Sequence, residues 1–554
     1  NRVLVLEPTT TAWMYASIPA AQPELMETGR AFQEFITALE YAQVEFDLAS
    51  ERIMRDHGRA ENAGLRVGQR VYQVVVLPPG TRNLDQATAK MLGDYLRSGG
   101  RVVSLVDPPA FIDGSPTSEL SELASAQAQN WRRANSLDEA LPLLPSSGIR
   151  VTAGRLLHQR RRLAAGEILF FANNDLKQGA KASVTAIGEA VTELDALHGA
   201  LRQYPSRAES GGTAFEVDLA PGGSLLVLVG APAADTAPAI APPVELKPVA
   251  PASKLAVSRL SPNTIRLDYC DIEAGGQTMK DIYYFAAQEA AYRANGFPSN
   301  PWNTAVQFQQ RIVEQDRFPA GSGFTATFRF TLAPGVPRKG LRAAVERPAL
   351  YRVSVNGKPA EPVKGAWWLD VDFGVYDIGP LVTDGENTIT LAIAPMSIHA
   401  ELEPVHLLGE FGVEPAERGW RLVPPAPLAT GDWVSAKLPF YPDRVAYAAD
   451  YSLAAGVRHF VQLPRWHGTV AEVRVNGKPA GLIAWQPYEL EITPHVRKGR
   501  NRVEVIVTGS LKNLLGPHHG KINRGLVSPR SFRDAPANQP PGTAYDLDRY
   551  GLLE

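Results

Sequence analysis

Alternating apolar and polar positions run into an Asn-Gly turn at two places in this chain. The first is VSVNGKP at 353–359, and the second is VRVNGKP at 473–479. Such a turn between alternating runs is the strongest short-range sign of a β-hairpin, because both of its central residues need a positive φ. A matched phrase follows each copy, GEN at 385–387 and GRN at 499–501. The chain therefore contains one hairpin twice, and we expect two similar β-sandwich modules.

The first 110 residues alternate between short β-branched runs and helical periodicity. Strands are predicted at 3–6, 71–77 and 101–106, and helices at 23–42 and 85–97. A helix that stops at Ser-Gly-Gly and feeds a strand is typical of a parallel sheet. With a mostly helical stretch to about 150, we expect a flavodoxin-like α/β domain over 1–150. Its strand ends, at 7–9 and 78–80, are where such sheets bind ligands, although a purely structural layer is the favoured interpretation.

Beyond residue 150 the apolar period changes to two. Strands predicted at 167–174, 214–219 and 224–229 indicate a small β-sandwich over 151–230. The Ala- and Pro-rich segment 231–251 predicts a stiff linker. We expect a first jelly-roll sandwich over 252–425, with a helix at 279–295. A second jelly roll with a C-terminal tail packed on it is expected over 426–554.

Composition narrows the function classes. The chain has 554 residues, a formal net charge of −2 and one cysteine. This charge gives no reason to expect nucleic acid, and no apolar run is long enough to span a membrane. The single thiol excludes an intrachain disulfide framework and a cysteine-rich metal site. The short run RRR at 160–162 is interpreted as a solvated face.

Carboxylates are the first candidates for chemistry, since cutting a glycosidic bond needs two of them, one protonated. The densest group is Glu401, Glu403 and Glu410, with His399 and His406 between them. No barrel-like strand ends surround this group, so a polar loop is favoured over a catalytic centre.

Aromatic residues are the second candidates, because the apolar face of a sugar ring stacks on an indole or phenol ring. Trp466-His467 and Trp485 with Tyr488 flank the second repeat, and Trp367-Trp368 lies at a similar place in the first. A matching tryptophan in both copies favours a structural role, and sugar binding remains the alternative.

The tail segment NLLGPHHG at 513–520 is present only in the second copy. Asn513, His518 and His519 could bond sugar hydroxyls, one histidine could be a metal ligand beside protein carboxylates, or they could be loop residues without partners. Adjacent histidines do not both face one metal ion from an extended chain, so no metal site is assigned. We predict a carbohydrate-binding set of seven residues: Trp466, His467, Trp485, Tyr488, Asn513, His518 and His519.

Two further activities find no support in the sequence. An amidotransferase-like α/β domain would need an exposed cysteine on a strand-to-helix elbow, and Cys270 lies in a β context beyond the linker. No glycine-rich phosphate loop follows the first strand, so nucleotide binding is not supported.

The phrases VRVNGKPAG, WQPYELEIT and GRNRVEVIVT, with this domain order, resemble the C-terminal half of large bacterial glycoside hydrolases. The resemblance is to the α-L-rhamnosidase type of glycoside hydrolase family 106, with galactose-binding-like modules similar to those of family 2. It implies a catalytic (α/β)₈ barrel outside this chain, a degenerate amidotransferase-like α/β domain and a possible calcium ion.

The leading hypothesis is that this chain is the non-catalytic part of an exo-acting glycoside hydrolase, whose barrel we expect upstream of Asn1. The alternative is a stand-alone carbohydrate-binding or cell-surface protein without hydrolytic activity. A third interpretation is an enzyme complete in these residues, using Glu401, Glu403 and Glu410. We expect a carbohydrate substrate as partner, no nucleic acid, and a periplasmic or secreted location.

Overall fold

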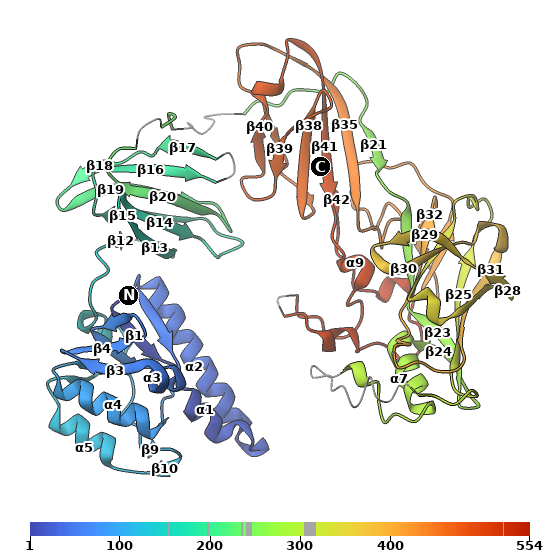
Figure 1. The fold of residues 1–554 in the computed structure, drawn as a ribbon. Coiled ribbons are helices and arrows are strands. Elements are labelled where there is room, and N and C mark those ends of the chain that lie inside the picture. The colour runs from blue at the N-terminus through green and yellow to red at the C-terminus, as the bar shows by residue number, and fades with distance from the viewer. Residues whose placement is uncertain are drawn as a thin grey trace. The chain divides into compact units, whose positions relative to one another are not determined.

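A computed structural model describes residues 1–152, 154–196, 199–233, 236–239, 246–303, 317–524 and 526–553. The chain forms two compact units (Figure 1). The first unit comprises Asn1–Leu246 with Trp485–Pro487, and the second comprises Lys247–Ala484 with Tyr488–Glu554. An α/β part therefore belongs to the first unit and most β-rich parts to the second, as a multidomain α/β plus β fold requires.

The N-terminal part is a five-stranded parallel sheet, in the order β11-β8-β6-β1-β2. This is the strand order of flavodoxin-like sheets. The strands are β1 (Val3–Leu6), β2 (Phe46–Ala49), β6 (Val74–Leu77), β8 (Arg101–Ser104) and β11 (Trp131–Arg133). Strand β11 was not predicted, because Trp131–Arg133 lies in a stretch expected to be mostly helical.

Helices cover both faces of this sheet, which explains why its strands are apolar throughout. Val3 and Val5 pack in one cluster with Phe35 and Leu39 of α2. Leu4 and Leu6 pack in the opposite cluster with residues of α3 and α4. The helices are α1 (Thr9–Ala16), α2 (Gln22–Tyr41), α3 (Glu51–His57), α4 (Gln86–Arg97) and α5 (Glu119–Ala126).

Two further antiparallel sheets of the first unit form the small sandwich. One has the order β12-β15-β19-β18 and the other β13-β14-β20-β16-β17. Phe171 of β14 and Phe215 of β19 meet edge to face at 6.1 Å, so one core joins the two sheets. The strands are β12 (Arg150–Thr152), β13 (Leu157–Leu163), β14 (Gly166–Ala172), β15 (Ala180–Ala186), β16 (Ala190–Asp195), β17 (Ala200–Gln203), β18 (Arg207–Glu209), β19 (Gly212–Leu219) and β20 (Ser224–Gly230).

Part of the predicted linker lies outside the described residues. Within the described part, Ala237 bridges to Arg202 as a parallel partner, and Gln203 N–H donates to the Ala237 carbonyl at 2.9 Å. This residue therefore adds to the edge of the small sandwich instead of running free.

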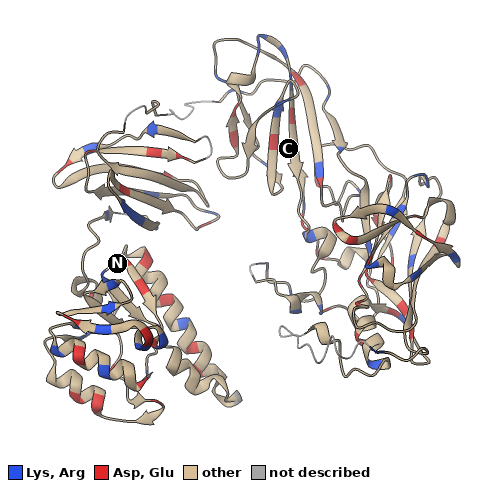
Figure 2. Cartoon of the chain, viewed as in Figure 1, with Lys and Arg blue, Asp and Glu red and all other residues tan. Residues whose placement is uncertain are grey.

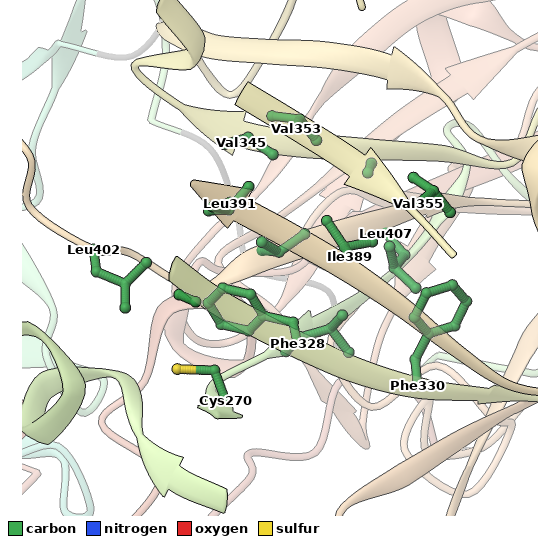
Figure 3. Packing of buried hydrophobic residues seen from close by; sticks show 14 of the residues in the cluster. Cys270, Phe328, Phe330, Val345, Val353, Val355, Ile389, Leu391, Leu402 and Leu407 are labelled. Carbon is green, nitrogen blue, oxygen red and sulfur yellow. The ribbon is translucent and has the colours of Figure 1, made fainter. Parts of the chain in front are cut away.

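The first sandwich of the second unit joins two sheets around one core, and their pairings are antiparallel except for the parallel pair β25–β34 (Figure 3). Phe328 and Ile389 come from one sheet and Val345 and Leu407 from the other. The first sheet holds β24 (Gln277–Tyr283), β23 (Tyr269–Ala274), β25 (Phe324–Leu332), β31 (Gly385–Ile393), β27 (Arg352–Val355) and β28 (Lys358–Ala360), with β33 (Gly412–Pro415) and β34 (Trp420–Val423) beside β25. The second holds β22 (Asn263–Leu267), β32 (Val405–Gly409), β26 (Arg342–Glu346), β30 (Asp370–Asp377) and β29 (Pro362–Trp368).

The predicted helix at 279–295 is shorter than expected. Helix α7 covers Tyr284–Ala294, while the residues before it belong to β24. Strand β24 pairs with β23, and the ladder hydrogen bonds of that pairing override the helical spacing of the apolar residues.

The second sandwich has one five-stranded antiparallel sheet, faced by two short ribbons that share its core. The sheet holds β21 (Ala256–Arg259), β35 (Arg444–Leu453), β41 (Gly499–Thr508), β38 (Val470–Val475) and β39 (Lys478–Ile483). The ribbons are β36 (Phe460–Gln462) with β40 (Glu489–Glu491), and β37 (Trp466–His467) with β42 (Gly551–Leu552).

Strand β21 departs from the expected boundary at residue 252. It was expected in the first sandwich, but it pairs with β35 of the second. The chain thus begins the second sandwich, builds the first and then returns. Such long-range pairing leaves no local pattern in the sequence.

Both predicted Asn-Gly hairpins are present. Asn356 and Gly357 have φ values of 50° and 77°, and Asn476 and Gly477 have 53° and 80°. Two successive positive φ values are the geometry of a type I′ turn, which matches the twist of the flanking strands.

The C-terminal tail packs on both sandwiches, not on the second alone. The hydroxyls of Tyr269 and Tyr283 in the first sandwich donate to the backbone carbonyls of Pro536 and Phe532 at 3.0 and 3.2 Å. The tail then returns to the second sandwich, where β42 pairs with β37.

Basic and acidic side chains are interspersed along both units (Figure 2). The run at 160–162 follows this pattern, since Arg160 forms ion pairs with Glu45 and Glu167 at 2.5 and 3.2 Å. Among the helices of the described residues, none is long and apolar enough to cross a membrane.

Candidate functional site

A cavity of about 590 Å³ opens in the second sandwich. Three of the seven predicted binding residues, Trp466, His467 and Tyr488, lie in its wall. Its complete lining is Trp466, His467, Gly468, Ala484, Tyr488, Leu547, Asp548, Arg549 and Tyr550.

Strand pairing positions one wall of the cavity. Trp466 lies opposite Leu552 and His467 opposite Gly551 in the β37–β42 ribbon. Side chains alternate between the faces of a strand, so Trp466 packs into the core while His467 is exposed. The ring of Trp466 meets that of Tyr488 at 5.5 Å and 90°. These contacts fix both rings before any ligand binds.

The opposite wall comes from tail residues 547–550, which are held from behind by Asn513. Its side-chain amide donates to the Asp548 carbonyl at 2.8 Å, and its side-chain oxygen accepts from the Asp548 N–H at 2.7 Å. Tyr550 is held by Ser510, with 2.5 Å between their hydroxyl oxygens, and by Trp433 N–H, which donates to its carbonyl at 2.9 Å. Asn513 is only 1% exposed and is absent from the lining. Its place is therefore one of support.

The lining suits a saccharide ligand. The half-buried ring of Tyr488 offers a flat apolar face, while the imidazole of His467 and the guanidinium of Arg549 offer hydrogen-bonding groups.

The other predicted residues lie elsewhere. Trp485 is 55% exposed but is not part of the lining. His518 and His519 are 2% and 6% exposed, so they present almost no surface to a saccharide. Of the seven predicted residues, Trp466, His467 and Tyr488 lie together in the cavity wall, and His518 and His519 are not part of it.

Both histidines belong to a buried polar cluster between the tail and the first sandwich. His519 Nε2 is 3.5 Å from Asp268 Oδ2, and the Tyr545 hydroxyl donates to Asp268 Oδ1 at 2.9 Å. Burial opposes ionisation of Asp268, but the hydrogen bond with His519 and the charge of Arg266 leave its pKa lowered. His518 Nε2 is 2.8 Å from the Asn513 carbonyl. Burial and the charge of Arg266 lower the pKa of His518 to about 3, so this imidazole is neutral at physiological pH.

The structure separates the three glutamates considered for catalysis, Glu401, Glu403 and Glu410, into different surroundings. Glu410 is exposed and forms an ion pair of 2.6 Å with Arg259. Glu401 and Glu403 lie near Glu346, which sequence reasoning missed because it comes from β26. Burial, reinforced by the charges of Glu346 and Glu401, raises the pKa of Glu403 to about 8. Arg347 approaches Glu401 at 4.0 Å.

The two histidines interleaved with these glutamates do not join them in a site. His406 is buried against the rings of Trp368 and Phe373, and burial lowers its pKa to about 3. His399 stacks near Trp302 at 5.6 Å. His406 is therefore a packed side chain, whereas His399 is exposed.

The carboxyl edge of the parallel sheet is closed by its own residues. Glu51 is buried and accepts hydrogen bonds from the Thr10 hydroxyl and from the Asp85 N–H. Burial raises the pKa of Glu51 to about 7 in spite of these bonds. This edge is thus satisfied internally, as a structural layer would be.

Calcium is the ion that the family resemblance implies. Among the described residues, no group of three or more His, Cys, Asp or Glu side chains is arranged to hold a metal ion.

Cys270 is buried, and burial raises the pKa of its thiol, which is the opposite of what a nucleophile needs.

Sequence reasoning missed the tail wall at 547–550. Its side chains follow neither a helical nor a strand period over any length, since only Gly551–Leu552 pairs as a strand. The adjacent Arg549 and Tyr550 were the only available signal.

Comparison with known proteins gives weak likenesses only. No family model and no curated protein matches the chain. The rhamnosidase from Novosphingobium sp. PP1Y is similar at 14% identity and a TM-score of 0.41, over 92% of this chain and 35% of that one. The α-L-rhamnosidase from Streptomyces avermitilis, complexed with L-rhamnose, is 14% identical with a TM-score of 0.19, over 65% and 36%. The exo-carrageenase GH42 from Bacteroides ovatus is 12% identical with a TM-score of 0.28, over 41% and 28%.

These solved structures are rhamnosidases and another glycoside hydrolase. The chain spans about a third of the length of the first of them. At such TM-scores the likenesses decide neither the family nor the substrate.

Proposed function

We propose that this chain is the non-catalytic, carbohydrate-binding portion of an exo-acting glycoside hydrolase of the α-L-rhamnosidase type. Its two sandwiches, in this proposal galactose-binding-like jelly rolls, support a catalytic barrel outside the chain. The whole protein acts in the periplasm or outside the cell. The observation that carries the binding role is the cavity lined by Trp466, Tyr488 and Tyr550, with polar groups between the rings.

A binding measurement tests this role. Saturation-transfer NMR with a panel of methyl glycosides, both neutral and acidic, detects even millimolar affinities. We expect sugar protons to show saturation transfer, and the effect to fall at least tenfold when Tyr488→Ala removes one aromatic wall.

A matched control is available in the first sandwich. Trp367 is 57% exposed and lies outside the cavity, so Trp367→Ala should leave binding unchanged. Absence of transfer from every sugar, or equal loss in both variants, would overturn the assignment of the cavity.

An activity measurement tests the non-catalytic part. The chain by itself should release no nitrophenol from aryl glycosides. The carboxyl of Glu403, with its raised pKa, is the group that could act as a general acid. Release that disappears in Glu403→Gln would replace this proposal with the self-contained enzyme.

A further inference from the structure

We propose that the cavity of the second sandwich takes an anionic saccharide, a uronate or a sulfated sugar, whose acid group pairs with Arg549. This inference rests on the proposed carbohydrate-binding function and adds the charge class of the ligand. The observation behind it is an uncompensated cation beside an aromatic wall.

Arg549 lies in the lining and is exposed. Among the residues that the structure describes, its guanidinium makes no hydrogen bond and no ion pair. A guanidinium offers a planar fork of donors that matches a carboxylate or a sulfate with two parallel hydrogen bonds. The cavity thus contains a free anion-binding group.

The carboxylates nearest in sequence are already occupied. Asp548 forms an ion pair with Arg524. Asp546 accepts two hydrogen bonds from Arg524, at 2.8 and 2.9 Å, and is 3.3 Å from Lys512 Nζ. Both carboxylates are thus paired with Arg524 or Lys512, and neither pairs with Arg549.

The backbone on both sides of Arg549 is fixed. Asn513 bonds both the N–H and the carbonyl of Asp548. On the other side, Trp433 N–H donates to the Tyr550 carbonyl at 2.9 Å. A group presented on a fixed backbone loses less conformational entropy when it binds, so its pairing with a ligand is stronger.

The remainder of the lining indicates that the anion is carried by a sugar. Trp466 is nine-tenths buried, and its ring N–H has no acceptor among the described residues. A buried donor without a partner is costly. The half-buried ring of Tyr488 supplies a surface for a pyranose face. A bare inorganic anion would use only Arg549.

The test compares sugars that differ only in charge. Binding of methyl glucuronide and methyl glucoside, and of galactose 6-sulfate and galactose, is measured by NMR titration against the whole chain. We expect each acidic sugar to bind at least tenfold more tightly than its neutral partner, and Arg549→Gln to abolish that preference. The better of the two acidic sugars identifies the source of the charge. Arg502 is exposed outside the cavity, so Arg502→Gln should change nothing.

Every other outcome of this test overturns part of the proposal. Equal binding of acidic and neutral sugars overturns this inference while the carbohydrate-binding function stands. Binding of none of the four sugars overturns that function as well. A preference that survives in Arg549→Gln removes Arg549 from the site. Inorganic sulfate that binds as tightly as the sulfated sugar would show an anion site with no role for the sugar ring.

Discussion

The side-chain amide of Asn476 donates a hydrogen bond of 3.0 Å to the side-chain oxygen of Asn501. Asn356 and Asn387 form the same bond in the first sandwich, at 2.8 Å. Asn501 also donates to the carbonyls of Arg497 and Gly499 at 2.7 and 2.8 Å. Each Asn-Gly hairpin is thus joined to the Gly-x-Asn phrase that follows it. The two halves of the repeat are one structural device.

Removing the second asparagine of this pair should destabilise the second sandwich. Asn501 is fully buried, so Asn501→Ala leaves the Asn476 amide and two backbone carbonyls without their partner. Each buried group left unpaired costs about 1–3 kcal/mol, and we expect a loss of ~2–4 kcal/mol in the free energy of unfolding. Urea denaturation measures it. The double variant Asn476→Ala, Asn501→Ala should cost less than the sum of the single changes, and strict additivity would contradict the pairing.

Asn513 should affect ligand binding without touching the ligand. Asn513→Ala frees both backbone groups of Asp548, so the tail wall loses its fixed geometry. We expect saccharide affinity to fall by about tenfold, with hydrogen exchange of residues 547–550 increased. If residues 547–550 exchange hydrogen at the wild-type rate and the saccharide affinity is unchanged, other contacts hold this wall in place.

The protein should lose stability as the pH becomes acidic, because His518 is buried. Its pKa is lowered from 6.5 to about 3 by burial, so the unfolded chain binds a proton that the folded chain does not. The free energy of unfolding therefore has its full value above about pH 6.5, and it decreases as the pH falls towards 3. His518→Gln removes this titration, and its melting temperature should depend less on pH in that window. An unchanged dependence would place the acid sensitivity elsewhere, His406 being the next group to vary.

Glu403 should produce the opposite slope. Burial, with the charges of Glu346 and Glu401, raises its pKa from 4.5 to about 8, so the folded chain holds a proton that the unfolded chain has lost. Stability from this group is present below pH 4.5 and is lost as the pH rises to about 8. Glu403→Gln keeps the shape without the charge, and its melting temperature should decline less between those values. Glu410→Gln, at an exposed ion pair, is the control and should follow the wild type.

Several elements could be predicted because their cause is local. The helix at 85–97 begins where the Asp85 side chain accepts from the Thr88 N–H at 2.6 Å, and it ends at a glycine-rich turn. The predicted strands of the small sandwich follow a period of two over seven or eight residues. Such signals act within a few residues, and no distant contact reverses them.

The lining of the cavity was only partly predictable. Trp466, His467 and Tyr488 were singled out because aromatic and polar residues stand together in the sequence, and all three lie in the lining. His518 and His519 were also among the predicted binding residues, but they are buried. The Tyr545 and Asp268 side chains around them come from other segments of the chain. Burial depends on what covers a residue, and the sequence near that residue does not record it.

The sequence by itself determined the two hairpins, since Asn356-Gly357 and Asn476-Gly477 supply the positive φ values that a type I′ turn requires. It also determined the order of α/β and β-rich parts through their periods. Tertiary structure alone decided that β21 and β42 complete the second sandwich and that residues 547–550 close its cavity. These are pairings between segments more than eighty residues apart in the chain. Their free energy comes from hydrogen bonds and apolar contacts that form only when segments distant in the sequence meet.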